Sequence, residues 1–283
     1  MKRKLSIRYG LIIFTASLLL LSPFFINEKY ISVFQFHIAS KKITQKILQD
    51  YYSSNSSLQK DAARFIIEST LENLNYHHWK EYIEYIDLSL YQAHVLPSSH
   101  GELIVVLNLS KDLAVMGIYT LQNDTYVFSH KIEELLPVQN LEFISVPHQD
   151  YQFIISEQRL DERLGALFEE RHVEIFVYKN GKFQSIWKKI KYLNEIYNAQ
   201  WMDPKESPEK WFQTIEENQI EFVKNETVKI SVSIHQQKRK ALKKSIPLPT
   251  DFEEVWDIRT EEIFYWNPDY QQFIIQKKTS YPS

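Results

Sequence analysis

The chain has 283 residues, a formal net charge of −3 and no cysteine. This length allows one or two domains, and the balance of 33 Lys and Arg against 36 Asp and Glu excludes the strongly basic surface of a general nucleic-acid binder. The absence of cysteine excludes thiolate metal sites, cysteine nucleophiles, disulfides and a lipidated lipoprotein cysteine, and the 5 glycines leave little room for a phosphate-binding loop.

An apolar segment near the start predicts a transmembrane helix. Lys and Arg residues at positions 2, 3, 4 and 8 precede an uncharged run over residues 9–26. At about 1.5 Å per residue this run spans about 27 Å, close to the ~30 Å hydrocarbon core of a bilayer. The excess of cations before the run predicts a cytosolic tail over residues 1–8 and an extracytoplasmic remainder.

A cleaved signal peptide is the alternative interpretation of this segment. Cleavage needs small residues after the apolar run, whereas residues 22–26 read Ser-Pro-Phe-Phe-Ile. We therefore expect an uncleaved single-pass signal anchor in the cell membrane, with the lipid bilayer as the partner of residues 9–26. A tail of eight residues is too short to fold, so we expect no cytosolic signalling domain of its own.

Residues 27–98 predict a stalk followed by a helical region. Residues 27–37 suit a stalk or an edge strand, and residues 87–96 suit either a helix or a strand. Apolar residues at helical spacing predict the second helix, with Ser57 as its N-cap. The three expected helices cover residues 40–53, 57–74 and 79–86.

Residues 99–283 predict an antiparallel β domain, because the apolar pattern changes to period two from Gly101 onward. The strongest hairpin signal is Asn180-Gly181, since this pair supplies both positive-φ positions of a type I′ turn. The turn predicts that Tyr178 pairs with Phe183 and Ile175 with Ile186. We expect a second hairpin around Asn225-Glu226 and a long excursion between β units over residues 198–217.

An internal similarity links residues 143–155 to residues 264–275. Each segment reads as a strand, a turn containing proline and a second strand with Phe-Ile-Ile. A duplicated β unit and the shared demands of two hairpins both explain it. The predicted fold class is α+β, mainly antiparallel β, with one N-terminal transmembrane helix and a β domain arranged as a meander, a sandwich or a partial propeller.

Acidic residues are dense between positions 157 and 174. Two such carboxylates could serve a glycosidase, and an oxygen cluster could hold calcium. Arg159, Arg163 and Arg171 alternate with them, so we favour a salt-bridged solvent loop. The carboxylates are Glu157, Asp161, Glu162, Glu169, Glu170 and Glu174.

Two further patterns resemble catalytic or metal sites. His77, His78, His94 and His100, with Glu102, are zinc-ligand types, but none has the tight H-E-x-x-H spacing. The S-x-x-K pattern of serine acyl-enzymes occurs at Ser57 to Lys60, without its S-D-N element. We favour structural histidines and a helix cap.

Basic and aromatic clusters have both a structural and a binding interpretation. The run from Lys238 to Lys244 could contact anionic headgroups or wall polymers, and a solvated loop after a strand is the simpler interpretation. Tryptophans could form binding platforms, and we favour core positions for them. The aromatic clusters are Tyr76–Trp79, Trp201 with Trp211, and Trp256 with Phe264, Tyr265 and Trp266.

No residue is assigned as catalytic, cofactor-binding or metal-ligating, and no cofactor is expected. The sequence favours a non-catalytic, membrane-anchored extracytoplasmic protein of the cell envelope. It would bind an envelope protein or polymer through the β domain and would not bind nucleic acid. The alternative is an extracytoplasmic, carboxylate-dependent hydrolase of glycosidase type.

Overall fold

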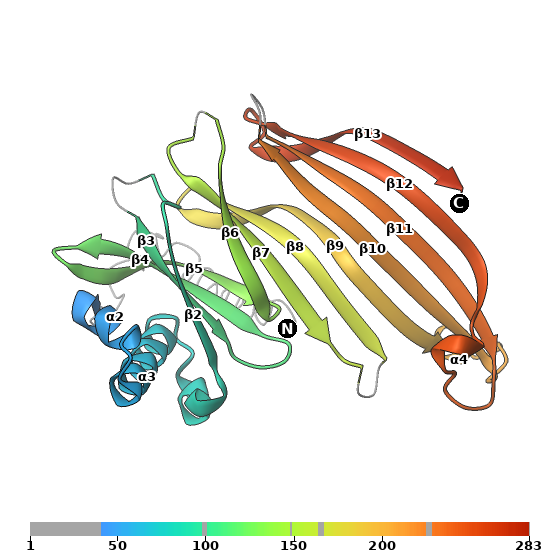
Figure 1. Cartoon of the computed structure of the whole chain (residues 1–283), viewed down its shortest axis with the longest axis horizontal. Coiled ribbons are helices and arrows are strands. Elements are labelled where there is room, and N and C mark those ends of the chain that lie inside the picture. Colours follow the sequence, from blue (N-terminus) through green and yellow to red (C-terminus); the bar gives the residue numbers. More distant parts are fainter. Residues whose placement is uncertain (1–40, 98–100, 148, 164–166, 225–227, 283) are drawn as a thin grey trace, which may run out of the picture. The chain divides into compact units, whose positions relative to one another are not determined.

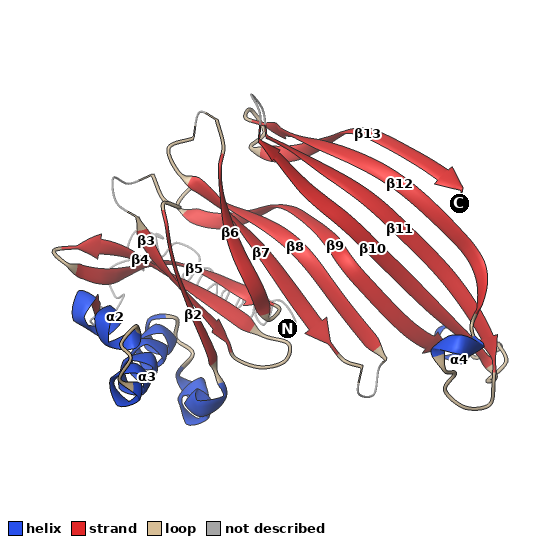
Figure 2. Cartoon of the chain, viewed as in Figure 1, coloured by secondary structure: helices blue, strands red, loops and turns tan. Residues whose placement is uncertain are grey.

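A computed structural model describes residues 41–97, 101–147, 149–163, 167–224 and 228–282. The chain divides into two units, residues 1–39 and residues 40–283, and only the second is described below. This second unit is mainly antiparallel β, with few helices (Figure 2). Its strands form a five-stranded half-barrel sheet and an eight-stranded meander sheet.

The five-stranded sheet has the order β1-β5-β4-β3-β2 (Figure 1). Its central strands are buried on both faces, so their apolar runs are continuous and the expected period-two pattern does not hold for them. The expected antiparallel β structure after Gly101 is confirmed, and the ambiguous segment over residues 87–96 is mostly a strand. The five strands are β1 (Ile43–Thr44), β2 (Asp87–Ala93), β3 (Glu102–Asn108), β4 (Ala114–Gln122) and β5 (Thr125–Leu135).

The three helices lie between β1 and β2 in the chain, and only the first is shorter than expected. Helix α2 covers Gln45–Tyr51, because Thr44 caps its first turn after the short strand β1. Helix α3 covers Ser56–Asn73, and its N-cap is Asn55 rather than Ser57, since Asn55 Oδ1 accepts from the amides of Ser57 and Leu58. The third expected helix is a 3-10 helix, η3 (His77–Tyr85).

The eight-stranded sheet is a meander in which every strand pairs with its neighbours in the chain (Figure 1). The expected 198–217 excursion is shorter: it opens with α4 (Ala199–Met202) directly after β9, and β10 already begins at Lys210. A short 3-10 helix, η4 (Pro249–Asp251), precedes β12. The strands are β6 (Val138–Ser145), β7 (Gln152–Asp161), β8 (Phe168–Lys179), β9 (Lys182–Asn198), β10 (Lys210–Lys224), β11 (Val228–Leu242), β12 (Glu253–Asn267) and β13 (Gln272–Pro282).

The Asn180-Gly181 turn joins β8 to β9, as expected. Both turn residues have positive φ, 53° and 81°, and Tyr178 lies opposite Phe183. The predicted pairing of Ile175 with Ile186 is wrong, because the register shifts by one residue between Ile175 and Phe176. Ile175 lies opposite Trp187, which places both side chains in the same hydrophobic cluster.

The large sheet closes on itself, so that distant strands come into contact. Phe153 on β7 and Trp266 on β12 are five strands apart, about 24 Å in a flat sheet at ~4.8 Å per strand. Their ring centroids are only 4.9 Å apart. Pairs between β9 and β10 stop at Tyr192 and Glu217, so beyond this point the two halves of the sheet separate and pack face to face.

The similar segments at 143–155 and 264–275 are both hairpins, β6–β7 and β12–β13. The phenylalanine of each Phe-Ile-Ile motif, Phe153 and Phe273, packs against the ring of Trp266. A second cluster joins the two sheets through residues such as Ile104, Ile118 and Ile154. The similarity therefore coincides with equivalent packing roles at the closure of the large sheet.

Candidate functional site

A groove of about 770 Å³ crosses the large sheet and is the best candidate site among the described residues. Six of its lining residues form a single row, because each lies opposite the next in the strand register. Residues opposite each other in antiparallel strands share one face. The row runs from β8 to β13 through Arg171, Tyr192, Glu217, His235, Arg259 and Tyr281.

The row combines both charge signs with aromatic surface. Glu217 and Arg259 are exposed, and the Tyr281 side chain is 51% exposed. The Arg171 guanidinium lies 5.3 Å from the centre of the Tyr192 ring, a cation–π contact that holds both side chains at the rim. The groove therefore offers hydrogen-bond donors, acceptors and flat apolar rings along one line.

A histidine–aspartate pair lies on the same face. His235 Nε2 lies 2.9 Å from both oxygens of Asp257. The carboxylate accepts a hydrogen bond from the Nε2–H group and so orients the imidazole. Gln237 Nε2 donates to the same carboxylate at 2.6 Å. Because the carboxylate has these two donors, the imidazole ring is held in one orientation beside the groove.

The carboxylates between positions 157 and 174 lie mostly on strands, not on a solvent loop. The expectation of a loop is wrong, because β7 and β8 extend through Asp161 and from Phe168. The expected ion pairs are confirmed: Glu169 contacts Arg159 and Arg171 at 2.9 Å each. The hydrogen bond from Arg163 lowers the pKa of Asp161 to about 2, so this group stays ionised near neutral pH.

On β8, Glu170 and Glu174 lie on the face opposite to that of Glu169, on either side of the buried His172. Its two ring nitrogens are 3.2 Å and 3.7 Å from these carboxylates. Burial alone lowers the pKa of His172, but the two carboxylates outweigh it and the pKa lies above its usual value. The imidazole correspondingly lowers the pKa of Glu170. The arrangement is an internal ion cluster rather than an open site.

A second ion cluster binds the two halves of the large sheet together. The Glu262 carboxylate on β12 lies 2.8 Å from Lys189 on β9 and 3.0 Å from Lys278 on β13. Burial alone raises the pKa of Glu262, and the two ammonium groups bring it below its usual value. The cluster therefore holds Glu262 ionised and stabilises the closure.

The remaining sequence candidates do not come together. His77 and His78 begin η3, His94 follows β2, and His100 lies outside the described residues. Within the described ranges, no group of three or more His, Asp or Glu residues could hold a metal ion. Ser57 and Lys60 lie on the exposed first turns of α3.

The basic run and the aromatic clusters are placed differently from the sequence-based expectation. Residues 238–242 belong to β11, so the solvated-loop interpretation is wrong for most of the run. Trp211 is buried, as expected, whereas Trp201 is 61% exposed.

The groove row escaped sequence reasoning, since its residues are spread over more than 100 positions. Only the cross-strand register brings them into line, and no local motif records it.

In the part of the chain that the structure covers, no helix is long and apolar enough to cross a membrane. The expected membrane segment, residues 9–26, lies outside the described residues. Comparisons with known protein families, curated proteins and solved structures find no match to this chain.

Proposed function

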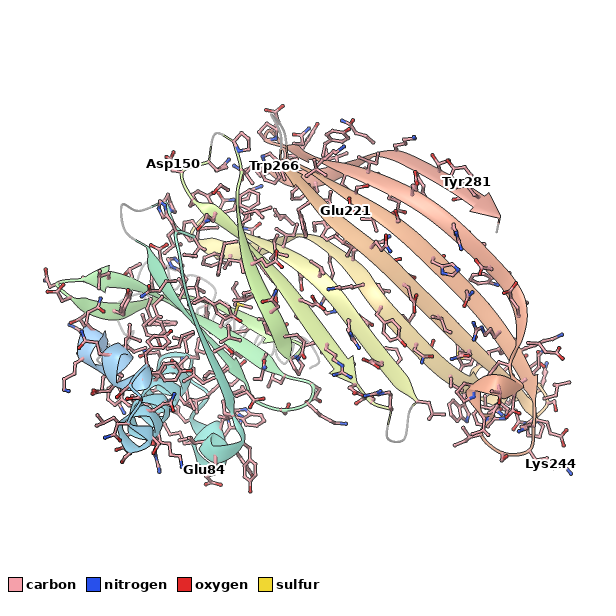
Figure 3. The ribbon with its side chains drawn as sticks, viewed as in Figure 1. Glu84, Asp150, Glu221, Lys244, Trp266 and Tyr281 are labelled. Carbon is pink, nitrogen blue, oxygen red and sulfur yellow. The ribbon has the colours of Figure 1, made fainter. Side chains whose placement is uncertain are left out.

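We propose that this protein is a non-catalytic binding protein, held in the cell membrane by residues 9–26, whose extracytoplasmic β unit binds a partner protein. The observation that carries the proposal is the row of side chains along the groove, which ends at Tyr281 on β13 (Figure 3). A row across six strands is about 24 Å long at ~4.8 Å per strand, which suits an extended polypeptide segment.

The mixture of charges favours a peptide over a uniformly charged polymer. Glu217 and Glu261 alternate with Arg171 and Arg259 around the groove. A strongly anionic polymer would be attracted by the arginines of the groove but repelled by its carboxylates. A peptide with both charge signs and apolar side chains can satisfy the cations, the carboxylates and the tyrosine rings together.

An extracytoplasmic hydrolase remains the second candidate, and the observation that favours it is the His235–Asp257 pair beside the groove. A carboxylate that orients an imidazole is a common device of general-base catalysis. The carboxylates first considered for a glycosidase suit it poorly. A general acid needs a raised pKa, whereas the pKa values of Asp161, Glu170 and Glu174 are lowered.

The test uses the absence of cysteine from the chain. Gln219→Cys introduces one thiol at an exposed position of the groove. A membrane-impermeant, thiol-reactive crosslinker on intact cells should join this residue to a partner protein. Arg259→Glu should reduce the yield at least about tenfold, because reversing one interfacial charge costs more than ~1.4 kcal/mol.

The matched control is Arg64→Glu, which makes the same change at an exposed position on α3. It should leave the crosslinking yield unchanged. A thiol that reacts only after the cells are permeabilised would show that the orientation is wrong. A yield that is unaffected by Arg259→Glu would refute the groove as the binding site.

A further inference from the structure

Five exposed apolar side chains gather at one end of the large sheet, away from the groove. We call them the apolar tip: Trp201, Met202, Leu242, Ile246 and Leu248. Their exposed fractions range from 57% to 78%. They come from α4, the end of β11 and the connector before β12, which lie together beyond the strand ends (Figure 1). Large exposed apolar patches of this kind mark binding surfaces.

The backbone beneath the apolar tip is firmly held. Trp211 Nε1 donates to the carbonyl of Lys243 at 3.1 Å, and the Trp201 ring packs edge-on against Trp211 at 5.7 Å. The amide of Leu248 donates to Asp251 at 2.7 Å. These contacts fix the connector in a conformation that points its apolar residues outward, so rearrangement of a loose loop does not explain their exposure.

The charges around the apolar tip are of both signs, and two ion pairs lie among them. Lys243 pairs with Asp251, and Lys210 pairs with Glu206. Lys244 is exposed and lies beside α4 at this end of the sheet (Figure 3). Tryptophan, aliphatic residues and lysine together are typical of segments at a membrane–water interface, where the rings and stems enter the lipid and the ammonium groups stay in water.

The length of chain before the described unit keeps this unit close to a bilayer. Only residues 27–40, 14 in number, separate the expected membrane segment from β1 and its preceding residues. Fully extended, they span at most about 48 Å at ~3.4 Å per residue. The lipid surface is therefore within reach of the anchored protein at all times, and it is the partner with the highest local concentration.

We infer that the apolar tip inserts into the outer surface of the membrane that anchors the protein. This inference rests on the proposed attachment through residues 9–26. Insertion fixes the orientation of the large sheet relative to the bilayer, and with it the direction in which the groove faces. Since the surrounding charges are of both signs, insertion depends on apolar burial and only weakly on anionic lipid.

The experiment uses the full chain in vesicles of phosphatidylethanolamine and phosphatidylglycerol, and in vesicles of phosphatidylcholine alone. Met202→Cys and Ile246→Cys each give the chain a single thiol for a spin label. In both vesicle types, the labels should be reached by oxygen from the lipid and shielded from a water-soluble nickel complex. Their depth should be about 5–10 Å into the boundary of headgroups and acyl chains.

Tyr85→Cys, at a residue that is 81% exposed on η3, is the matched control and should stay accessible to the nickel complex. Labels at 202 and 246 that are as accessible to water as this control would overturn the inference. Shielded labels with strong coupling between spins would identify a second copy of the chain as the occupant instead. A full chain that does not float with vesicles at all would refute both the tip and the membrane attachment, which separates that failure from a failure of the tip alone.

Discussion

Tyr119 on β4 shows how one buried polar group ties a helix to a sheet. Its side chain is fully buried, and its hydroxyl lies 2.8 Å from Thr70 Oγ1 and accepts from Asn73 Nδ2 at 3.2 Å. Burial raises the pKa of Tyr119 to about 12, because the phenolate would lose its hydration. In the unfolded chain the pKa is near 10, so the phenol stabilises the fold fully below pH 10 and loses this contribution as the pH rises toward 12.

Tyr119→Phe tests this assignment. Near neutral pH the variant should lose about 1 kcal/mol of unfolding free energy, because the hydrogen bonds to Thr70 and Asn73 are removed. Between about pH 10 and 12, the natural chain should lose about 2–3 kcal/mol relative to the variant. Urea unfolding at a series of pH values measures both effects. A difference that stays constant up to about pH 12 would contradict the raised pKa.

At the scale of elements, the contact between α3 and the five-stranded sheet depends on a glycine. A Cβ atom added at Gly117 would lie 3.1 Å from Tyr119 Cε2 and 3.2 Å from Thr70 Cγ2. Both distances are shorter than ordinary van der Waals contacts, and both neighbours are packed in the core. The glycine therefore sets how closely α3 approaches β4.

Gly117→Ala should lower the free energy of unfolding by about 1–3 kcal/mol, because the added methyl group displaces Tyr119 or Thr70. Gly101→Ala is the control, since the nearest atom to its added Cβ is the Ala93 oxygen at 3.8 Å. The control should change stability by no more than about 0.5 kcal/mol. Equal effects of the two substitutions in urea unfolding would show that α3 has room to move.

At the scale of the whole described unit, closure of the large sheet is the main long-range feature. Phe153 contacts Trp266 although four strands separate β7 from β12, and the ring of Phe273 on β13 also packs against Trp266. The ion cluster of Glu262 with Lys189 and Lys278 lies on the same face. The groove row crosses the last pair between β9 and β10, so its shape depends on how the two halves separate.

Phe153→Ala should cost about 3–5 kcal/mol of unfolding free energy, because it removes a fully buried ring at the closure. Phe65→Ala, at a 37% exposed position on α3, should cost much less. Urea unfolding of both variants provides the measurement. Similar losses for the two variants would mean that the closure contributes little to stability.

Local sequence signals identified the elements that depend on neighbouring residues. The Asn180-Gly181 turn, the strands after Gly101 and the ion pairs of Glu169 with arginine follow from turn chemistry, strand-forming residues and charge spacing. The errors have two causes: one is a choice between neighbouring cap residues, and the other is a register shift between two strands. Asn55 rather than Ser57 caps α3, and a one-residue shift moves Ile175 opposite Trp187.

By itself, the sequence determined that the described unit is mainly antiparallel β, since alternation and turn residues act over a few positions. The apolar run over residues 9–26 likewise predicts the membrane segment directly from its length and composition. Only the tertiary structure decided the groove row and the apolar tip. Both bring together residues that are distant in the chain, and their alignment depends on strand register, on the curl of the sheet and on which loops meet at its end.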